Sequence, residues 1–366
     1  MKRILMMSAA AISFGGMAQA GGIDRSGQGL GFLFEKGTYG ELSIGSVAPS
    51  VSGISTPTYG SRPSGDMAGD YTSLSIAYKQ DLSDRLSVGL IVDQPFGADV
   101  SYPVGTGYYA QGSVAELDTV AITGLLKYTT DTNFSVYGGL RYQTLSATAT
   151  VPFVASYDVD GSKDGGLGYV IGAAWEKPEI ALRVALTYNS SIKHELNTSD
   201  ASLLSGGAYV SSITPIETPQ SVNLDFQTGI AKDTLVFGGV RWVDWSAFVI
   251  DPPNYPAPSP LVSYDSDTIS YSLGIGRRLN EKWSVAATLG YEKPTKGYSS
   301  NLGPNDGYSS FGLGATYTKG NMKITAGVRY VDVGKAQTTL DGGVSTAGNF
   351  TSNHAVGAGI KVGWSF

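Results

Sequence analysis

The stretch Asn353–Phe366, NHAVGAGIKVGWSF, decides the fold. Every second residue from Val356 to Phe366 is apolar, and the residues between them are small or polar. Period-two alternation is typical of a β-strand with one apolar face. It runs to the final residue and ends on aromatic side chains, as in the closing strand of a transmembrane barrel. We therefore expect a membrane-spanning strand that ends at Phe366 and is received by a barrel-assembly machinery.

The first twenty residues indicate export. Lys2 and Arg3 precede an apolar stretch, and Ala18-Gln19-Ala20 has the small-residue pattern of a signal-peptide cleavage site. Without Lys2 and Arg3, 23 of the 25 basic residues remain against 31 acidic ones, a formal charge of −8. Such a balance argues against nucleic-acid binding. The absence of cysteine excludes disulfides and thiolate metal sites.

Alternating segments follow residue 38 in pairs, separated by short turns. The turns are rich in Asn, Asp, Gly and Pro, the residues that tight turns require; they fall at residues 81–85, 130–133, 176–179, 232–233, 280–282 and 319–321. Six hairpins, a strand near Tyr39–Val47 and the terminal strand make fourteen strands. Short turns on one rim, long loops on the other and an even strand number are the outer-membrane pattern. The sequence predicts an all-β, 14-stranded antiparallel transmembrane barrel over residues 39–366.

A soluble, lipocalin-like barrel has the same alternation with its apolar face inside. The strand number, the one-sided loop lengths and the isolated charges on the polar face argue against it. In a membrane barrel these charges face the lumen. Four arginines of this set are candidates for contact with a charged ligand: Arg141, Arg183, Arg241 and Arg329.

A fourteen-stranded barrel is too wide for its own side chains to fill. Residues 21–38 precede the first strand and contain Leu30, Phe32 and Phe34 among glycines. Exposing this apolar group to water is costly, so we expect a small plug, or hatch, in the lumen. A periplasmic tail is the alternative.

Two further features concern a ligand. The long loops carry apolar residues, among them Phe153, Leu203, Leu204 and Ile213; such clusters mark interaction sites, although packing among the loops explains them as well. The third strand contains Pro95, Phe96 and Gly97. Proline lacks a ladder donor and glycine weakens pairing, which indicates a bulge or kink unless the strand has already ended there.

The chain resembles the FadL-type outer-membrane transporters of long-chain fatty acids and other hydrophobic compounds. The resemblance rests on Gln94-Pro95-Phe96-Gly97 followed by Tyr102-Pro103, on Trp242–Phe248, and on the segment from Ser270 to Pro294. It implies a monomeric barrel with a hatch, ligand capture by extracellular loops, and lateral exit at the kinked third strand. The family's Asn-Pro-Ala hatch element is not found here, which leaves the fold of the hatch open.

The leading functional hypothesis is therefore passive transport of a hydrophobic small molecule across the outer membrane of a Gram-negative cell, with no cofactor, no metal and no catalytic residue. A small-solute porin and a structural barrel are the alternatives. An outer-membrane protease or phospholipase needs acid–base partners. The chain has only His194, placed in a long loop, and His354 at the rim of a strand, and neither has a recognisable partner motif.

Overall fold

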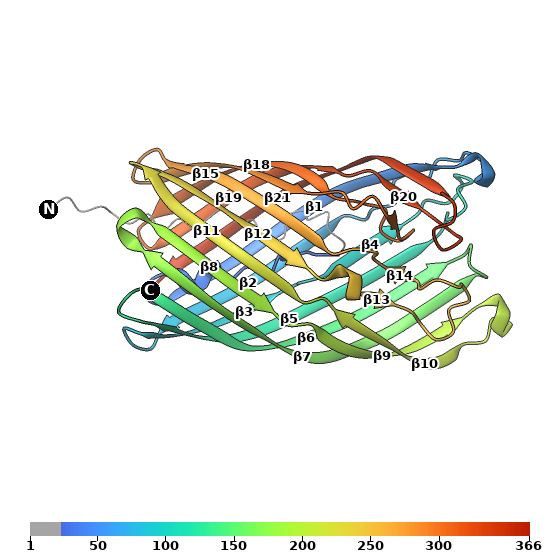
Figure 1. The fold of residues 1–366 in the computed structure, drawn as a ribbon, viewed down its shortest axis with the longest axis horizontal. Helices are drawn as coiled ribbons and strands as arrows, with labels where there is room; N and C mark the ends of the chain where they lie inside the picture. The colour runs from blue at the N-terminus through green and yellow to red at the C-terminus, as the bar shows by residue number, and fades with distance from the viewer. Residues whose placement is uncertain (1–22) are drawn as a thin grey trace.

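Fourteen antiparallel strands close into a barrel in the computed structural model, which describes residues 23–366 (Figure 1). The predicted fold class is confirmed. The signal peptide predicted over residues 1–20, and Gly21 and Gly22 of the predicted plug, lie outside the described residues. No helix within residues 23–366 is both long and apolar enough to cross a membrane.

Three of the fourteen barrel strands are interrupted and carry two labels each. The first six are β1 (Tyr39–Ser55), β2 (Tyr71–Asp81), β3 (Leu86–Asp93) with β4 (Gly97–Ser101), β5 (Val114–Thr129), β6 (Phe134–Val151) and β7 (Tyr157–Lys177). The other eight are β8 (Leu182–Asn189) with β9 (Ile192–Ala201), β10 (Val210–Thr218) with β11 (Ser221–Ala231), β12 (Thr234–Val243), β15 (Thr268–Arg278), β16 (Trp283–Glu292), β18 (Tyr308–Lys319), β19 (Met322–Val333) and β21 (Gly348–Ser365).

Short elements lie in the connections. Four are two- or three-residue strands, namely β13 (Val249–Ile250), β14 (Val262–Ser263), β17 (Tyr298–Ser299) and β20 (Ala336–Thr338). Five are single 3-10 turns, namely η1 (Gly31–Phe34), η2 (Pro57–Tyr59), η3 (Pro178–Ile180), η4 (Leu203–Ser205) and η5 (Trp245–Ala247). The C-terminus lies at one end of the barrel, whereas β13, β14 and β20 lie towards the other (Figure 1).

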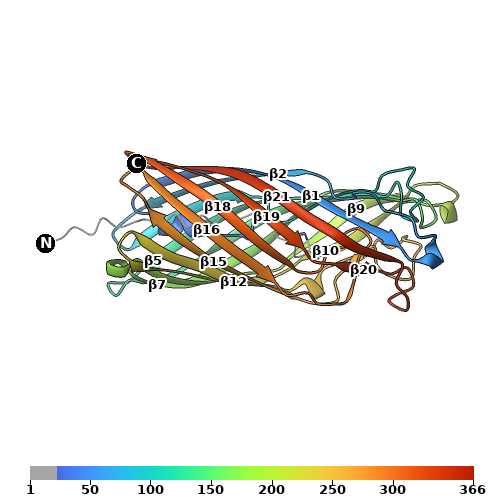
Figure 2. The same ribbon diagram turned by 90° about the horizontal axis from the view of Figure 1, so that it is seen from above.

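The barrel closes where the first strand meets the last. β1 pairs antiparallel with β21 from Tyr39 opposite Ser365 to Ser55 opposite Gly348, and seen from above β21 lies between β1 and β19 (Figure 2). The Phe366 amide N–H also donates to the Thr38 carbonyl oxygen at 2.9 Å. Closure removes both sheet edges, as a wall in hydrocarbon requires.

The outer surface is an apolar belt between two aromatic girdles. On β16, Trp283 and Tyr291 are 46% and 49% exposed and mark the two edges. These residues are eight positions apart, which at a rise of about 3.3 Å per residue and a tilt of about 40° gives a belt roughly 20 Å high. On β6, Phe134 and Tyr142 hold the corresponding positions. The outer face therefore has the height and the edges of a membrane-spanning surface.

Two segments differ in detail from the sequence-based expectation. The alternating segment predicted to start at Ile180 starts at Leu182, because Pro178–Ile180 forms the 3-10 turn η3. The stretch expected to be a long loop after Tyr188 instead continues as β9 and β10, which pair from Ile192 opposite Thr218 to Asp200 opposite Val210. His194 therefore lies on a strand and not in a loop. Its imidazole is buried on the inner face of the barrel, opposite Ile216 of β10.

The interior is filled in two levels. Near the short turns, η1 places Phe32 and Leu33, 3% and 0% exposed, against inward-facing side chains of the barrel that include Ile91 and Leu125. Near the long connections a second apolar cluster joins Leu145, Trp245 and Phe248. The cavities of the candidate functional site lie within and beside the second cluster.

Candidate transport route

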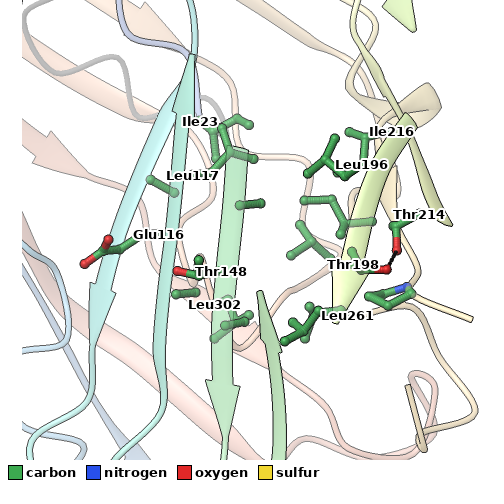
Figure 3. A pocket seen from close by; sticks show the side chains of 18 of the residues that line it. Ile23, Glu116, Leu117, Thr148, Leu196, Thr198, Thr214, Ile216, Leu261 and Leu302 are labelled. Atoms are coloured by element: carbon green, nitrogen blue, oxygen red, sulfur yellow. Dashed lines mark hydrogen bonds between the residues drawn. The ribbon is translucent and has the colours of Figure 1, made fainter. Parts of the chain in front are cut away.

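An apolar cavity of about 60 Å³ lies in the half of the barrel near the long connections. In Figure 3, Ile23 and Leu117 face Leu196 and Ile216 across the space, while the Glu116 carboxylate points away from it. The lining residues, all within 23–366, include no lysine, arginine or histidine. An apolar cavity of about 150 Å³ holds one benzene ring, so a ring enters this smaller space only if its walls move.

Four aromatic rings pack together beside this cavity, and two of them, Phe248 and Tyr264, line it. Trp245 packs edge-on against Phe96 at 5.8 Å between ring centroids and against Phe248 at 5.9 Å, and it contacts Tyr264 at 5.3 Å. Burial raises the pKa of the Tyr264 phenol, so this ring stays uncharged at neutral pH. Within the segment Trp242–Phe248, the Trp245 ring thus contacts Phe96 of the irregular third strand.

A wider cavity of about 280 Å³ lies among the long connections and shares Leu261 and Leu302 with the apolar cavity. Phe153 lines it and packs edge-on against Tyr109 at 5.7 Å. The other three residues expected to capture ligand lie elsewhere. Leu203 and Leu204 are 69% and 77% exposed in the turn η4 at the tip of the β9–β10 hairpin, and Ile213 is 56% exposed on β10. Of the four, only Phe153 lines a described cavity, and a capture role for the others remains a prediction.

The third barrel strand is broken at Gln94–Phe96, between β3 and β4. Its pairing with β2 ends at Val92 opposite Ile76, and β4 forms a ladder with β5 but, on its other side, only the isolated bridge of Val100 with Ala68. The Leu74 N–H, left without a backbone partner on this side, bonds the Gln94 side-chain oxygen at 3.0 Å. Farther along, the Gly69 N–H donates to the Asp99 carbonyl at 2.9 Å. Between these two bonds the barrel wall has no β-ladder, and we call this opening the window.

The N-terminal segment satisfies the broken strand from inside. The Arg25 N–H donates to the Pro95 carbonyl at 2.8 Å, and the Gly97 N–H donates to the Ile23 carbonyl at 2.9 Å. On the wall side, the Phe96 N–H donates to the Thr119 hydroxyl at 2.9 Å. The kink thus costs no unpaired backbone group at these positions, because the hatch and β5 supply the partners that β2 does not.

A cavity of about 130 Å³ lies behind the window. It shares Ile23, Ala98 and Tyr264 with the apolar cavity, and it is also lined by Arg25, Tyr71 and Asp99. The three cavities therefore adjoin one another from the long connections to the window, in the order 280, 60 and 130 Å³.

The four candidate arginines lie away from the apolar cavity and are engaged by the protein. Arg241 forms a buried ion pair with Asp24 of the hatch at 2.7 Å and donates to Asn223 at 2.7 Å. Arg141 donates to Thr123 at 2.8 Å. The other two contact a ring or a hydroxyl: Arg183 lies 4.5 Å from the Phe34 ring centroid, and Arg329 donates to Ser310. Arg183, Arg241 and Arg329 line another cavity, of about 210 Å³, beside the hatch.

The two histidines form no catalytic arrangement. His194 is buried, with Nε2 3.2 Å from the Gln143 side-chain nitrogen and Nδ1 3.6 Å from an Asp164 oxygen. His354 stacks on Tyr330 at 6.1 Å. No serine or threonine hydroxyl is bonded to either ring in the part of the chain described, and residues 23–366 contain no cluster of three or more potential metal ligands.

Sequence reasoning overlooked Asp24, Arg25, Tyr71 and Asp99. One signal was available, because Asp24 and Arg25 are the only charged residues between positions 21 and 34. Charges are seldom retained in a short apolar plug unless they are paired. The partners, however, follow the segment by 74 and 217 positions and carry no local pattern.

Comparisons with known proteins match the whole barrel. Three solved structures share its fold at low identity: a Pseudomonas aeruginosa FadL homologue (15% identity, 92% of each chain covered, TM-score 0.74), the toluene transporter TodX of P. putida (14%, 91% of each chain, 0.64) and the Ralstonia pickettii toluene transporter TbuX (14%, 91% of this chain and 90% of that one, 0.63). None of the curated proteins compared with the chain matches it. The model of one family covers residues 46–366. The chain therefore belongs to the outer membrane protein transport protein family that includes OMPP1, FadL and TodX.

Proposed function

We propose that this barrel takes up uncharged apolar molecules from outside the cell and releases them sideways into the outer membrane through the window. Its family transports hydrophobic compounds across that membrane. The observation that carries the finer proposal is the row of adjoining cavities, which leads from the long connections to a break in the wall.

The lining of the cavities supports an uncharged ligand. A carboxylate buried in the 60 Å³ cavity would meet no cationic side chain, and an unpaired buried charge is strongly unfavourable. The arginines that line the 210 Å³ cavity are separated from the apolar cavity by their position beside the hatch. Two of the similar structures are toluene transporters, which supports a small aromatic or aliphatic hydrocarbon over a fatty-acid anion.

The position of the window supports lateral release. Glu116 and Asp118 are exposed on the outer face of β5, one strand away, and mark the polar zone above the apolar belt. The window lies beside them, and its lower edge at Leu74 and Val92 is within the belt. An apolar molecule that leaves by this lower edge enters the outer leaflet directly.

A reversible cross-link across the window tests this route. The native chain has no cysteine, so a Tyr71→Cys, Asp99→Cys variant reacts with a short bis-methanethiosulfonate, which forms disulfides that a reductant cleaves, only at the window. Uptake of the neutral fluorophore N-phenylnaphthylamine is measured in Gram-negative cells whose lipopolysaccharide layer is intact. We expect the cross-link to stop protein-dependent uptake and a reductant to restore it.

A matched pair controls for the reagent. Ser46 and Thr72 are opposite each other on β1 and β2, whose ladder is intact. Cross-linking Ser46→Cys to Thr72→Cys closes nothing, and uptake should not change. Uptake that continues through the cross-linked window would exclude lateral exit and leave passage beside the hatch.

A further inference from the structure

The Arg25 side chain passes through the window and contacts both of its edges. Its Nη2 donates to the Asp99 carboxylate at 2.5 Å, and its Nε donates to the Gly97 carbonyl at 3.0 Å, both on β4. On the other edge, its guanidinium carbon lies 3.5 Å from the centroid of the Tyr71 ring on β2. β2 and β4 form these two edges, and no β-ladder joins them.

The Asp99 carboxylate lies on the outer side of the wall. Asp99 is opposite Glu116, and its neighbour Ala98 is opposite the buried Leu117. Residues directly opposite in an antiparallel pair share a face, so the Asp99 side chain points out, where it is 38% exposed. Arg25 starts from the hatch inside, and its side chain is only 10% exposed. Its guanidinium therefore fills the gap in the wall.

We propose that Arg25, Tyr71 and Asp99 form a latch that holds the window shut, and that an apolar ligand in the adjoining cavity opens it by displacing the guanidinium from the Tyr71 ring. This inference rests on the proposed lateral exit. The ligand reaches the latch directly, because all three residues line the 130 Å³ cavity behind the window.

The wall is shaped to accept the arginine. A Cβ at Gly97 would lie 2.8 Å from the Arg25 Nε, and a Cβ at Gly69 would lie 2.8 Å from the Asp99 Cβ. Either side chain would force the guanidinium or the β4 edge to move. Two small residues thus permit the close approach on which the latch depends.

The side chain of Arg25 is separable from the anchoring of the hatch. The hatch is held by the buried Asp24–Arg241 pair, by the Ser26 hydroxyl donating to Asp93 at 2.6 Å, and by backbone bonds to Pro95 and Gly97. Those contacts remain when the guanidinium is removed. Loss of the latch should therefore change release without releasing the hatch.

The test removes each part of the latch in turn. Arg25→Met keeps the length of the side chain without its charge, Asp99→Asn removes the ionic partner, and Arg85→Met is the control at an exposed pair with Asp131. Uptake of N-phenylnaphthylamine into cells should rise about three- to tenfold in the first two variants, because one ion pair and one cation–π contact shift a two-state equilibrium by that order. Binding of the fluorophore to the purified barrel should tighten by no more than the same factor, because a ligand that displaces the guanidinium binds the unlatched state better.

A charge exchange makes the test specific. Arg25→Asp combined with Asp99→Arg restores an ion pair across the window, and uptake should return towards the native rate, whereas Arg25→Asp alone should be fast. Heat-dependent gel mobility verifies that each variant is folded. The Asp99→Asn variant changes the latch while the sequence of the hatch stays native.

An uptake rate no higher than that of the native protein in both Arg25→Met and Asp99→Asn would overturn the latch proposal. If the cross-linked window still blocks uptake in that case, lateral exit stands and only the latch fails. If the cross-link does not block uptake, the exit route fails and the latch with it.

Discussion

At the scale of single residues, the site is built from side chains whose position matters more than their hydrophobicity. Phe153, Leu203 and Leu204 are all apolar residues of the long connections. Phe153 lines the 280 Å³ cavity, whereas the two leucines lie at the exposed tip of a hairpin. A molecule that follows the cavities meets Phe153 and need not meet the others.

This difference predicts unequal effects of substitution. Phe153→Ser should weaken binding of N-phenylnaphthylamine about fivefold, since removing about 40 Å² of apolar contact costs about 1 kcal/mol. Leu204→Ser, at an exposed position in the same half of the barrel, should change the Kd by less than about twofold. Equal weakening in a fluorescence titration of the two purified variants would restore the hairpin tip to the binding surface.

At the scale of elements, each strand carries two chemistries on alternate residues. On β21, Ile360 is 48% exposed on the outer face, while the next residue, Lys361, points inward with its Nζ 3.8 Å from Glu41. The two faces meet different surroundings: lipid outside, and inside a lumen where a charged side chain finds a charged partner, as Lys361 does. Whether a charged side chain is tolerated therefore depends on whether its position in the alternation faces the lumen or the lipid.

Parity can be tested with neighbouring substitutions. Ile360→Arg should lower the free energy of unfolding in lipid vesicles by about 2–4 kcal/mol, the cost of a guanidinium near the bilayer midplane. Lys361→Gln, one position along the same strand, should lower it by less than about 1 kcal/mol, because its ion pair is weak. A reversed order in denaturant titrations would mean that the two faces of β21 have been exchanged.

At the scale of the whole molecule, closure joins the ends of the chain. Tyr39 and Ser365 are opposite each other, and the ladder between β1 and β21 runs almost the full height of the barrel. The Phe366 ring is 79% exposed at the end of this seam. It contributes little buried area to the folded barrel, so we expect this side chain to act in assembly rather than in stability.

We accordingly predict that Phe366→Ala uncouples folding rate from stability. The free energy of unfolding should change by less than about 0.5 kcal/mol, as for other exposed sites. Insertion into vesicles that contain purified barrel-assembly machinery should slow several-fold, and insertion without the machinery should not. The Phe134→Ala variant, another exposed aromatic at the same rim, is the control. An equal delay in both variants would show a general effect of losing interfacial aromatics.

Much of this protein was determined by its sequence alone, because the deciding signals are local. Alternation identifies each strand, as in Val356–Phe366, and Asn, Asp, Gly and Pro identify the turns, so the 14-stranded barrel and its membrane-facing surface could be predicted. Pro95 and Gly97 likewise indicate a break through their own backbone chemistry. None of these inferences needs knowledge of a distant partner.

Only the tertiary structure decided which residues meet. Barrel closure and strand register bring Arg25 to Asp99 and Tyr71, and Asp24 to Arg241, across 74 and 217 positions for the two hydrogen-bonded pairs. The same packing places Phe96 against Trp245 and leaves Leu203 and Leu204 at a tip. Side-chain partners across a lumen depend on the summed register of every strand between them. That sum is a property of the closed barrel, which no single segment of the sequence contains.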